Sequence, residues 1–406
     1  MIEIALGTVL IVVLILVLSG VVIGVRSIIA PSGPVAITIN GNTEIIGRTG
    51  EKLLSVLNNA GIPVPSACAG AGTCGLCRVR VIDGAGAPLP TELARLSRDD
   101  LKQGQRLACQ VMVRGPMSVG VADDILAAES WMSQLRSARM LAPLIREMVF
   151  DIPETVAFAF RAGSYVQIEA PPYALDFGSI PIEPGFAAHW ERLGWRRLKS
   201  VSREPVHRAY SIASRPEDKG QIVLNIRLAV PPAGADESVP PGIVSSYLFG
   251  LQPGDSVAVS GPFGDFHVQD TDREMVFIGG GVGMAPLRAM IHEQLAAGTN
   301  RKITFWYGAR SGIDVFYADE FDALAQAHDN FQWTLALSEP QPEDDWRGAT
   351  GFIHEVVLRD YLKDHRAPEA CEFYLCGPPL MIQAVLGMLD SCGVEPHAIF
   401  NDDFGI

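Results

Sequence analysis

The stretch Cys68-Ala-Gly-Ala-Gly-Thr-Cys74-Gly-Leu-Cys77 decides how the first part of this chain folds. Its three cysteines, with Cys109 further along the chain, follow the C-x5-C-x2-C…C order expected for the ligands of a [2Fe–2S] cluster. The intervening glycines lack a Cβ atom, so the backbone can crowd such a cluster and point N–H groups at its sulfurs. The spacing therefore predicts four metal-ligating thiolates and, with them, a one-electron carrier.

Zinc is the main alternative for these ligands. Structural zinc sites prefer two separated C-x2-C pairs, and here only Cys74 and Cys77 form such a pair. Disulfides are disfavoured because the cysteines crowd one loop and the membrane topology described below places them in a reducing compartment. Cys371 and Cys392 have no ligand-like spacing, and we interpret them as buried thiols.

Length and charge limit the remaining possibilities. A chain of 406 residues is too long for one core and predicts three modules of ordinary size. The net charge of −14 argues against a nucleic-acid partner, which would require a basic face.

The N-terminal segment differs from everything that follows it. From Ile4 to Ile29 the only charged residue is Arg26, and about 20 apolar residues suffice to span a bilayer. We predict a retained transmembrane anchor in residues 1–30; a cleaved signal and a buried core helix are the alternatives. Arg26 follows the apolar run and Glu3 precedes it, which predicts a single pass with the C-terminal bulk in the cytoplasm.

Residues 31–129 are predicted to form a small β-rich module around the cysteine loop. A hairpin begins at Val35, a helix covers Lys52–Asn59, and a strand covers Arg78–Ile82. Cys109 is expected just ahead of another strand. The module resembles the α+β, β-grasp fold of plant-type ferredoxins, although its x5 gap departs by one residue from the x4 of that group.

Residues 130–270 are predicted to form an antiparallel β-barrel, because short β-like runs alternate with Pro/Gly turns. These runs are Arg139–Met148, Tyr165–Glu169, Gln221–Ala229 and Asp255–Ser260. An irregular insertion, Pro171–Ser202, interrupts the pattern with two tryptophans and a basic cluster. It is either a surface loop or a contact surface for a partner subunit or lipid headgroups.

Residues 271–406 are predicted to form a doubly wound α/β domain, since strands and helices alternate. The expected strands are Met275–Ile278, Ile303–Tyr307, Gln332–Leu337 and Glu372–Leu375, and a helix is expected at Ala285–Leu295. Three turns that follow parallel strands should meet at one crevice, where open α/β sheets bind ligands. Their candidate cofactor-binding residues are Gly279, Gly280, Gly281, Gly283, Tyr307, Gly308, Arg310, Cys376, Gly377 and Pro378.

A second set of candidates lies on the barrel. In Arg208-Ala-Tyr210-Ser211, strand alternation places Arg208 and Tyr210 on one face, where a guanidinium and a phenol ring suit a flavin. Gly242-Ile-Val-Ser245-Ser246 then opens a helix whose N–H groups and hydroxyls suit a phosphate. Taken singly, each motif has a structural alternative: an exposed arginine, an N-cap serine or a simple glycine turn.

In this order, the motifs resemble those of the ferredoxin–NADP reductase family. With the N-terminal anchor, the ferredoxin module and the ending Asn401-Asp-Asp-Phe404-Gly-Ile, the whole chain resembles the NADH-oxidising F subunits of bacterial sodium-translocating NADH:quinone reductases. The resemblance implies a bacterial inner-membrane protein that binds FAD, a [2Fe–2S] cluster and NADH, with the other subunits of the complex and the bilayer as partners.

The same resemblance implies roles for individual residues. Arg208 and Tyr210 would hold FAD, with Ser211 near flavin N5, and the serines at 245 and 246 would take its pyrophosphate. Phe404 would stack on the ring, and Cys376 with Gly377 would face the nicotinamide. Ser211, Cys376 and Phe404 are therefore the candidate catalytic residues; the alternatives are that Cys376 is a buried filler and Phe404 a docked core residue.

The implied reaction is a hydride transfer followed by single-electron steps. NADH gives up a hydride, the cluster takes one electron at a time, and FAD reconciles the two. Arg310 sits where an acidic residue often binds the ribose of NAD, so its position leaves NADPH open, and NADH follows from the resemblance. Sodium movement would belong to the complex, because one uncharged span offers no ion path. The alternatives are a membrane-tethered reductase that feeds an oxygenase, and a redox sensor or scaffold with a vestigial nucleotide site.

Overall fold

The structure, a computed structural model, describes residues 12–20, 33–66, 68, 70–232, 234–236 and 239–402. The chain divides into two compact units, Met1–Val64 with Gly70–Leu126 and Pro65–Ala69 with Ala127–Ile406. Of the predicted anchor, only residues 12–20 are described, and they are helical. Within the described ranges, no helix has the length and apolar character needed to cross a membrane.

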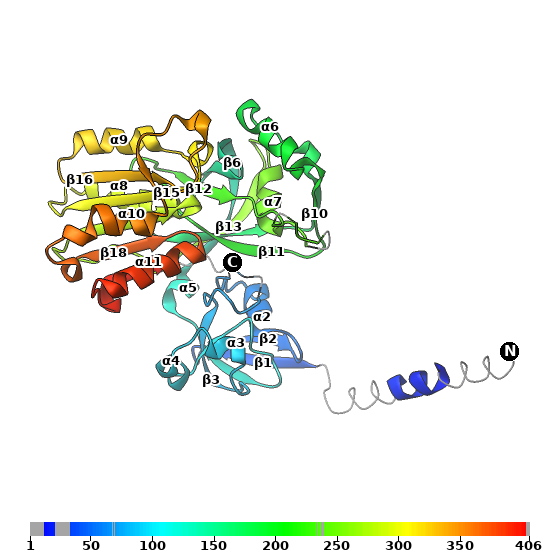
Figure 1. The fold of residues 1–406 in the computed structure, drawn as a ribbon. Coiled ribbons are helices and arrows are strands. Elements are labelled where there is room, and N and C mark those ends of the chain that lie inside the picture. Colours follow the sequence, from blue (N-terminus) through cyan, green and yellow to red (C-terminus); the bar gives the residue numbers. More distant parts are fainter. Residues whose placement is uncertain are drawn as a thin grey trace. The chain divides into compact units, whose positions relative to one another are not determined.

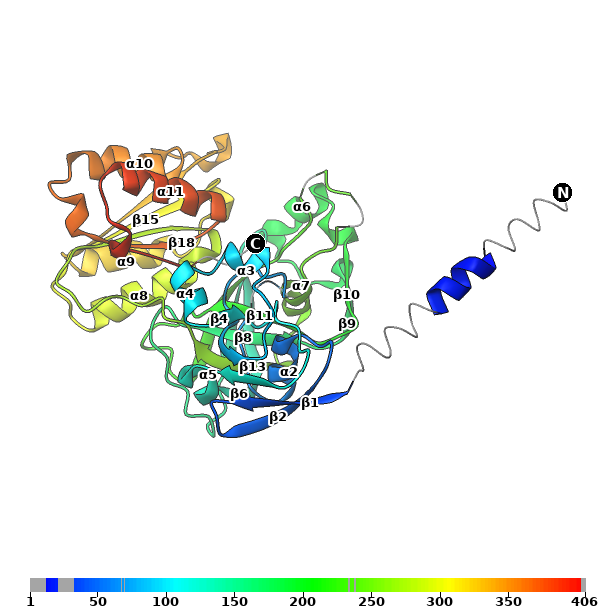
Figure 2. The same ribbon diagram turned by 90° about the horizontal axis from the view of Figure 1, so that it is seen from below.

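The first unit is a five-stranded mixed sheet with short helices (Figure 2). The strand order β2-β1-β5-β3-β4 contains one parallel pair, β1 with β5, as the predicted β-grasp fold requires. The alternate residues Val35, Ile37 and Ile39 of β1 are buried in a core that also contains residues of α2. The elements are β1 (Pro34–Ile39), β2 (Thr43–Arg48), α2 (Leu53–Asn59), β3 (Arg78–Asp83), α3 (Pro90–Leu93), α4 (Arg98–Lys102), β4 (Gln105–Leu107), β5 (Met117–Gly120) and α5 (Asp123–Ala127).

The second unit begins with the predicted antiparallel barrel, in the strand order β11-β8-β13-β6-β7-β12. An antiparallel bridge between Ile212 and Leu224 joins the two ends of this sheet. The run Arg139–Met148 is not one strand, because Pro143 and Leu144 form the turn between β6 and β7. The elements are β6 (Glu129–Ala142), β7 (Ile145–Asp151), β8 (Tyr165–Ala170), β11 (Val206–Ser211), β12 (Gln221–Arg227), α7 (Ile243–Gly250) and β13 (Ser256–Phe263).

The insertion at 171–202 is ordered, so the prediction of an irregular segment is wrong. It forms a two-stranded sheet and a helix beside α7 (Figures 1 and 2). Trp190 explains the order: its ring is fully buried, and Nε1 donates a hydrogen bond to the Pro143 carbonyl at 2.6 Å. The elements are β9 (Tyr173–Asp176), η1 (Phe177–Ser179), α6 (Pro184–Arg192), η2 (Trp195–Arg197) and β10 (Lys199–Ser202).

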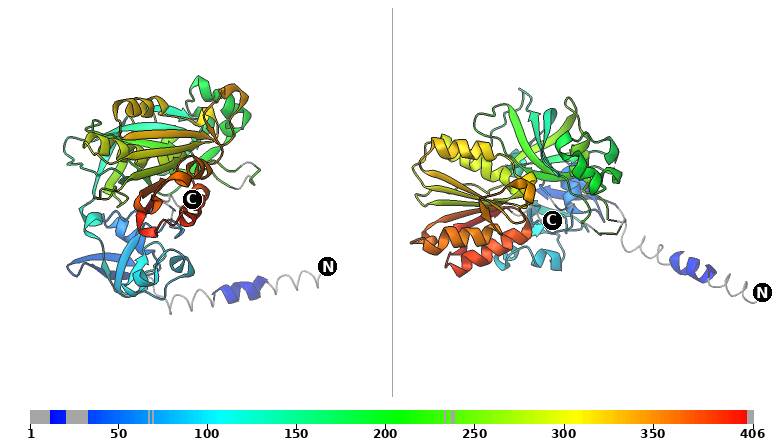
Figure 3. Two further views of the ribbon diagram at one scale, coloured as in Figure 1. Left: turned by 60° about the vertical axis from the view of Figure 1, so that its left-hand side comes forward. Right: turned by 45° about the horizontal axis from the view of Figure 1, so that its top comes forward.

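A parallel six-stranded sheet, in the order β17-β16-β15-β14-β18-β19, completes the second unit and confirms the doubly wound prediction. Helices α8 and α9 cover one face and α10 and α11 the other (Figure 3). Its strands are β14 (Met275–Gly280), β15 (Ile303–Ala309), β16 (Phe331–Leu337), β17 (Ala349–Thr350), β18 (Glu372–Cys376) and β19 (Ile399–Asp402). Its helices are η3 (Gly281–Gly283), α8 (Met284–Ala296), η4 (Gly312–Asp314), α9 (Ala318–Ala327), η5 (Pro342–Asp344), α10 (Ile353–Asp360), η6 (Leu362–Asp364), η7 (Pro368–Ala370), α11 (Pro379–Ser391) and η8 (Pro396–Ala398).

The winding of this sheet reverses between β14 and β18. The chain runs outward from β14 through β15 and β16 to β17, then returns to place β18 on the other side of β14. In open α/β sheets this reversal opens a crevice at the carboxyl ends of the two strands, and ligands bind there. The glycine turn after β14 and the Cys376 turn after β18 are therefore both at the switch point.

Candidate functional site

The cysteine loop has the backbone that its glycines predict. Gly70, Gly72 and Gly75 have φ angles of 79°, 82° and 73°, a left-handed conformation that residues with a Cβ atom rarely adopt. Of the four candidate ligands, Cys77 and Cys109 are buried and Cys68 and Cys74 are partly exposed. The expectation that Cys109 precedes a strand is wrong, since it lies in the turn after β4.

Contacts around Gly70 bring this loop against Cys109. The Gly70 carbonyl accepts hydrogen bonds from Gln110 Nε2 at 2.9 Å and from Lys52 Nζ at 3.1 Å. A Cβ atom placed on Gly70 would lie 3.6 Å from the Cβ of Cys109, which is van der Waals contact, so the two segments pack directly against each other. Thiolates from a tight glycine loop and a separate turn fit an iron–sulfur cluster.

On the barrel, β11 presents the predicted flavin residues Arg208, Tyr210 and Ser211. The strand pairs with β8, so Arg208 lies opposite Ile168 and Ser211 opposite Tyr165. Burial raises the pKa of Tyr210, which keeps its phenol neutral at physiological pH. Arg208 and Tyr210 are both half-buried, as expected for side chains that line a ligand face.

The start of α7 is held tightly by its own serines. Ser246 Oγ donates to the Gly242 carbonyl at 2.6 Å, and Ser245 Oγ donates to the same carbonyl at 3.2 Å. Neither serine is the N-cap, because Gly242 occupies that position. A Cβ atom on Gly242 would lie 2.8 Å from Ser245 Oγ and from the Ala229 Cβ, so the close approach requires glycine. The backbone N–H groups at this helix start suit a phosphate.

In the α/β domain, the three predicted turns meet. A Cβ atom on Gly283 would lie 2.0 Å from the Cys376 carbonyl oxygen, so the glycine loop and the Cys376 turn touch backbone to backbone. Gly280 also lies close to the third turn, since a Cβ atom on it would lie 3.3 Å from the Gly308 carbonyl oxygen. The Tyr307 hydroxyl donates to the Gly281 carbonyl at 3.2 Å. Gly281 is partly exposed and Gly280 and Gly283 are buried, so the loop has no large side chains at these positions and its backbone could closely approach a dinucleotide.

Asp402 links the barrel to this crevice, and it is not among the site residues predicted from the sequence. The Ser211 hydroxyl donates to Asp402 Oδ2 at 3.2 Å, and Asp402 pairs with Cys376 across β19 and β18. Two candidate catalytic residues from different domains are therefore both next to Asp402, Ser211 through a hydrogen bond and Cys376 through strand pairing. Its sequence signal was the Asn401-Asp-Asp-Phe404 ending, whose Phe404 lies outside the described residues.

Arg310, which directly follows β15, forms an ion pair with Glu339. Its Nε donates to Glu339 Oε2 at 2.8 Å, and both side chains are exposed. The carboxylate offsets the positive charge that would favour a ribose 2′-phosphate. An acidic group is therefore present beside Arg310, at residue 339 after β16.

A second cluster of ligand-type atoms lies at the amino ends of β14 and β18, opposite the crevice. Atoms of Glu274, His365 and Cys371 lie within 4.8 Å of one another. The Ala367 N–H donates to His365 Nδ1, which leaves the ring proton on Nε2, facing Glu274 at 3.2 Å. A metal would need that nitrogen unprotonated. Burial and Glu274 raise the pKa of Cys371 to about 12, so without a metal its thiol is protonated.

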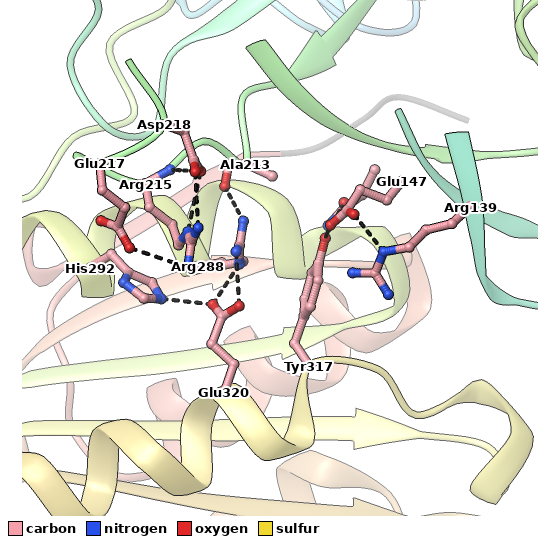
Figure 4. Close-up of polar contacts among 11 residues, drawn as sticks. Arg139, Glu147, Ala213, Arg215, Glu217, Asp218, Arg288, His292, Tyr317 and Glu320 are labelled. Atoms are coloured by element: carbon pink, nitrogen blue, oxygen red, sulfur yellow. Dashed lines mark hydrogen bonds and ion pairs between the residues drawn. The ribbon is translucent and has the colours of Figure 1, made fainter. Parts of the chain in front are cut away.

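A polar network joins the barrel to the α/β domain behind the crevice (Figure 4). Arg288 on α8 donates through Nη1 to the Ala213 carbonyl at 2.6 Å and through Nε and Nη2 to Glu320 at 2.6 and 2.8 Å. Its guanidinium also lies over the ring of Tyr317, whose hydroxyl donates to Glu147 of β7. Ala213 follows Ser211, the last residue of β11, by two positions. The network therefore connects the end of β11 to α8, the helix that follows the glycine loop.

Comparisons with known proteins agree with this geometry. The chain matches an oxidoreductase NAD-binding domain over residues 277–386, a 2Fe-2S iron-sulfur cluster binding domain over 37–114 and an oxidoreductase FAD-binding domain over 196–268. It is 47% identical over 406 residues to the F subunit of the Na(+)-translocating NADH-quinone reductase of Methylococcus capsulatus, covering 100% of both chains. The corresponding protein of Neisseria meningitidis is 48% identical over 405 residues, covering 99% and 100%. The chain belongs to this family.

Solved structures support the same arrangement of modules. An Amycolatopsis cytochrome P450 reductase superposes with a TM-score of 0.61 at 25% identity, covering 91% of this chain and 98% of its own. A ferredoxin reductase of carbazole 1,9a-dioxygenase superposes with a TM-score of 0.59 at 23% identity, covering 92% and 98%, which shows the fold alone. Together with the family, the three domain matches confirm the predicted multidomain fold and the predicted cofactors FAD, [2Fe–2S] and NADH.

Proposed function

We propose that this chain oxidises NADH at the switch point of its α/β domain and delivers the electrons singly to the [2Fe–2S] module. The observation that carries the proposal is the position of Asp402, whose carboxylate accepts a hydrogen bond from Ser211 of the barrel and which pairs in the sheet with Cys376 at the end of β18. FAD, when bound, accepts a hydride and releases electrons one at a time.

The residues around the crevice then have defined tasks. The glycine loop at 279–283 would place backbone N–H groups and the start of α8 at the dinucleotide pyrophosphate. Cys376 and Gly377, packed against Gly283, would form the wall that faces the nicotinamide. Asp402 holds the Ser211 hydroxyl in one orientation, so that Ser211 presents a fixed group toward the flavin edge.

The flavin itself would be held from the barrel. Arg208 would pair with its pyrophosphate, Tyr210 would pack on its ring, and the N–H groups at the start of α7 would take the phosphates near Ser245 and Ser246. Phe404 would cover the ring from the C-terminal end. Hydride transfer needs no protein acid or base, so the task of these residues is to orient the two rings and exclude water.

The nucleotide preferred by this site would be NADH. Arg310 directly follows β15, the second strand of the α/β domain. Its ion pair with Glu339 supports NADH over NADPH, because the carboxylate offsets the charge that would attract a 2′-phosphate. The electrons would leave through Cys68, Cys74, Cys77 and Cys109 as the cluster ligands. From there they would pass to other subunits of a membrane NADH:quinone reductase complex, the one to which the relatives from Methylococcus and Neisseria belong.

A membrane location extends the same proposal. The apolar run Ile4–Ile29 has the composition of a single bilayer span, and Arg26 at its C-terminal end favours a cytoplasmic location for the catalytic domains. We propose a single-pass anchor in residues 1–30 and a position at the bacterial inner membrane. The domain bounds 31–129, 130–270 and 271–406 are proposed as the cluster, FAD and NADH modules.

Arg208→Leu tests the flavin site. Without the guanidinium, the purified protein should lose most of its FAD and nearly all NADH–ferricyanide activity, while the cluster keeps its visible absorption and its iron. Flavin content after acid release and iron content are the measurements. Arg203→Leu, an exposed arginine in the turn before β11, is the matched control and should retain both cofactors. Full flavin content in Arg208→Leu protein would refute the assignment.

A further inference from the structure

The amide of Gln110 reaches the sulfur of a proposed cluster ligand. Its Nε2 lies 3.3 Å from Cys109 Sγ, within hydrogen-bonding reach of a thiolate, and 2.9 Å from the Gly70 carbonyl. The side chain also fills the space above Gly72, since a Cβ atom there would lie 2.8 Å from the amide carbon of Gln110. Gln110 is therefore packed between the two segments that would hold the cluster.

The direction of this amide is fixed by a second contact. The Thr91 hydroxyl donates to Gln110 Oε1 at 3.0 Å, so the carbonyl end faces α3 and the NH2 end faces the sulfur. The opposite orientation would place Oε1 against the Gly70 carbonyl, two acceptors with no proton between them. One NH2 proton of Gln110 then serves the Gly70 carbonyl, and the other faces the Cys109 sulfur and the Cys109 carbonyl oxygen, each 3.3 Å from Nε2.

The turn that carries Cys109 is itself anchored. The Glu92 carboxylate accepts the Leu107 N–H at 3.1 Å and pairs with Arg106 through two hydrogen bonds, at 2.8 and 2.7 Å. The side chains of Glu92 and Arg106 are 0% and 8% exposed, so the pair forms a rigid base under the turn. Thr91 is next to Glu92 on α3. The same short helix therefore contacts the Gln110 amide, through Thr91, and the turn that carries the Cys109 sulfur, through Glu92.

We propose that Gln110 sets the reduction potential of the [2Fe–2S] cluster through its hydrogen bond to the Cys109 thiolate. This inference rests on the proposed ligand role of Cys109. On reduction the cluster gains one electron, so negative charge on its sulfurs increases and an N–H donor stabilises the reduced form more than the oxidised form. No bond is formed or broken, and the electron is the one that FAD delivers. The amide therefore raises the potential of the cluster and favours electron flow from the flavin.

The test compares two substitutions in the full chain with both cofactors bound. Gln110→Leu removes the donor, and Gln110→Glu replaces it with a carboxylate near the sulfur. A hydrogen bond to a charged group is stronger than one between neutral groups, and only the difference in its strength between the two oxidation states changes the potential. We expect the flavin–cluster equilibrium to shift about tenfold away from the cluster in Gln110→Leu, or about 59 mV. The shift in Gln110→Glu should be larger.

The measurement is a redox titration followed by the paramagnetic signal of the reduced cluster, with iron content determined on the same samples. Gln103→Leu, an exposed glutamine at the end of α4, is the matched control and should titrate as wild type. Thr91→Val removes the hydroxyl that donates to Gln110 Oε1 but leaves the Gly70 carbonyl to orient the amide, so it should lower the potential by less than Gln110→Leu.

The outcomes separate this inference from the ligand assignment. Unchanged potentials in Gln110→Leu and Gln110→Glu with full iron content would refute the role of Gln110 and leave Cys109 as a ligand. If Gln110→Leu loses its iron, an unchanged potential in Gln110→Glu with full iron content refutes the role instead. A wild-type cluster in Cys109→Ser protein would refute the ligand assignment itself.

Discussion

Buried arginine–glutamate pairs occur in both units, and two of them, one from each unit, connect different parts of the structure. Arg106 and Glu92 lie within the cluster unit, where the Glu92 carboxylate also accepts the backbone N–H groups of Leu89 and Leu107 from the same small module. Arg288 and Glu320 lie in the second unit, where Arg288 also donates to Ala213 in the barrel. The first pair anchors one turn, whereas the second joins two domains.

The groups that lower the pKa of the glutamate also differ between the two pairs. Burial opposes the charge on Glu92, but Arg106 and the backbone N–H groups of Leu89 and Leu107 together lower its pKa. Burial also opposes the charge on Glu320, but His292 and Arg288 lower its pKa to about 2. Glu320 thus depends on two side chains from α8, so its ionisation is coupled to the position of that helix.

The largest effect should follow from breaking the more buried pair. Arg106→Met leaves the Glu92 carboxylate enclosed with only backbone donors, and removing one partner of a buried ion pair costs about 3–5 kcal/mol. Urea denaturation of the full chain, followed by the visible absorption of the cluster, measures the loss. The double variant Arg106→Met/Glu92→Gln should recover part of it, because no buried charge remains. Wild-type stability in the single variant would contradict an anchoring role.

Breaking the second pair should cost less stability and more activity. In Arg288→Met, Glu320 keeps His292 at 2.7 Å and is 20% exposed, so the expected loss is about 1–3 kcal/mol. Ala213, however, loses its link to α8, and we expect NADH-dependent flavin reduction to slow severalfold while the cluster potential is unchanged. Stopped-flow absorbance measures the rate of flavin reduction, and a redox titration measures the cluster potential.

The controls for Arg288 lie in the same unit. Arg359→Met breaks an exposed ion pair with Asp360 on α10 and should leave both stability and flavin reduction unchanged. Tyr317→Phe keeps the ring beneath Arg288 but removes the hydroxyl that donates to Glu147 and lies 2.9 Å from the Asn225 amide oxygen. It should slow flavin reduction less than Arg288→Met. Equal rates in all three variants would show that the network does not position the two domains.

Local features and long-range contacts differ in how well the sequence predicts them. The cysteine spacing and the glycine turns after β14, β15 and β18 carry local information, because each requires a special backbone or a close approach at a known position. Together with the alternation of strands, helices and Pro/Gly turns along the chain, these features predicted the β-grasp, barrel and doubly wound modules. The order of the 171–202 insertion did not follow, because Trp190 finds its partner at Pro143, on a different hairpin.

Contacts between distant residues explain most of the other omissions. Ser211 and Asp402 are 191 positions apart, and nothing near either residue signals the other. Gln110 adjoins Cys109 in the sequence, but only the folded loop shows which way its amide points. Arg310 stands out in the sequence, but its partner Glu339 becomes visible only when β15 and β16 lie side by side. Pairing across strands, rather than spacing along the chain, decides these sites.

The smallest effect should appear in the acid stability of the second unit. The folded-state pKa of Glu320 is about 2, below its ordinary value of 4.5, so its ion pair stabilises the fold above pH 4.5. That contribution should be lost as the pH falls from about 4.5 toward 2, because the carboxylate becomes protonated. Glu320→Gln should be less stable than wild type at pH 7, and the difference should shrink across this range. Thermal unfolding followed by flavin fluorescence at a series of pH values measures it. A difference that does not change with pH would show that Glu320 acts by packing rather than by charge.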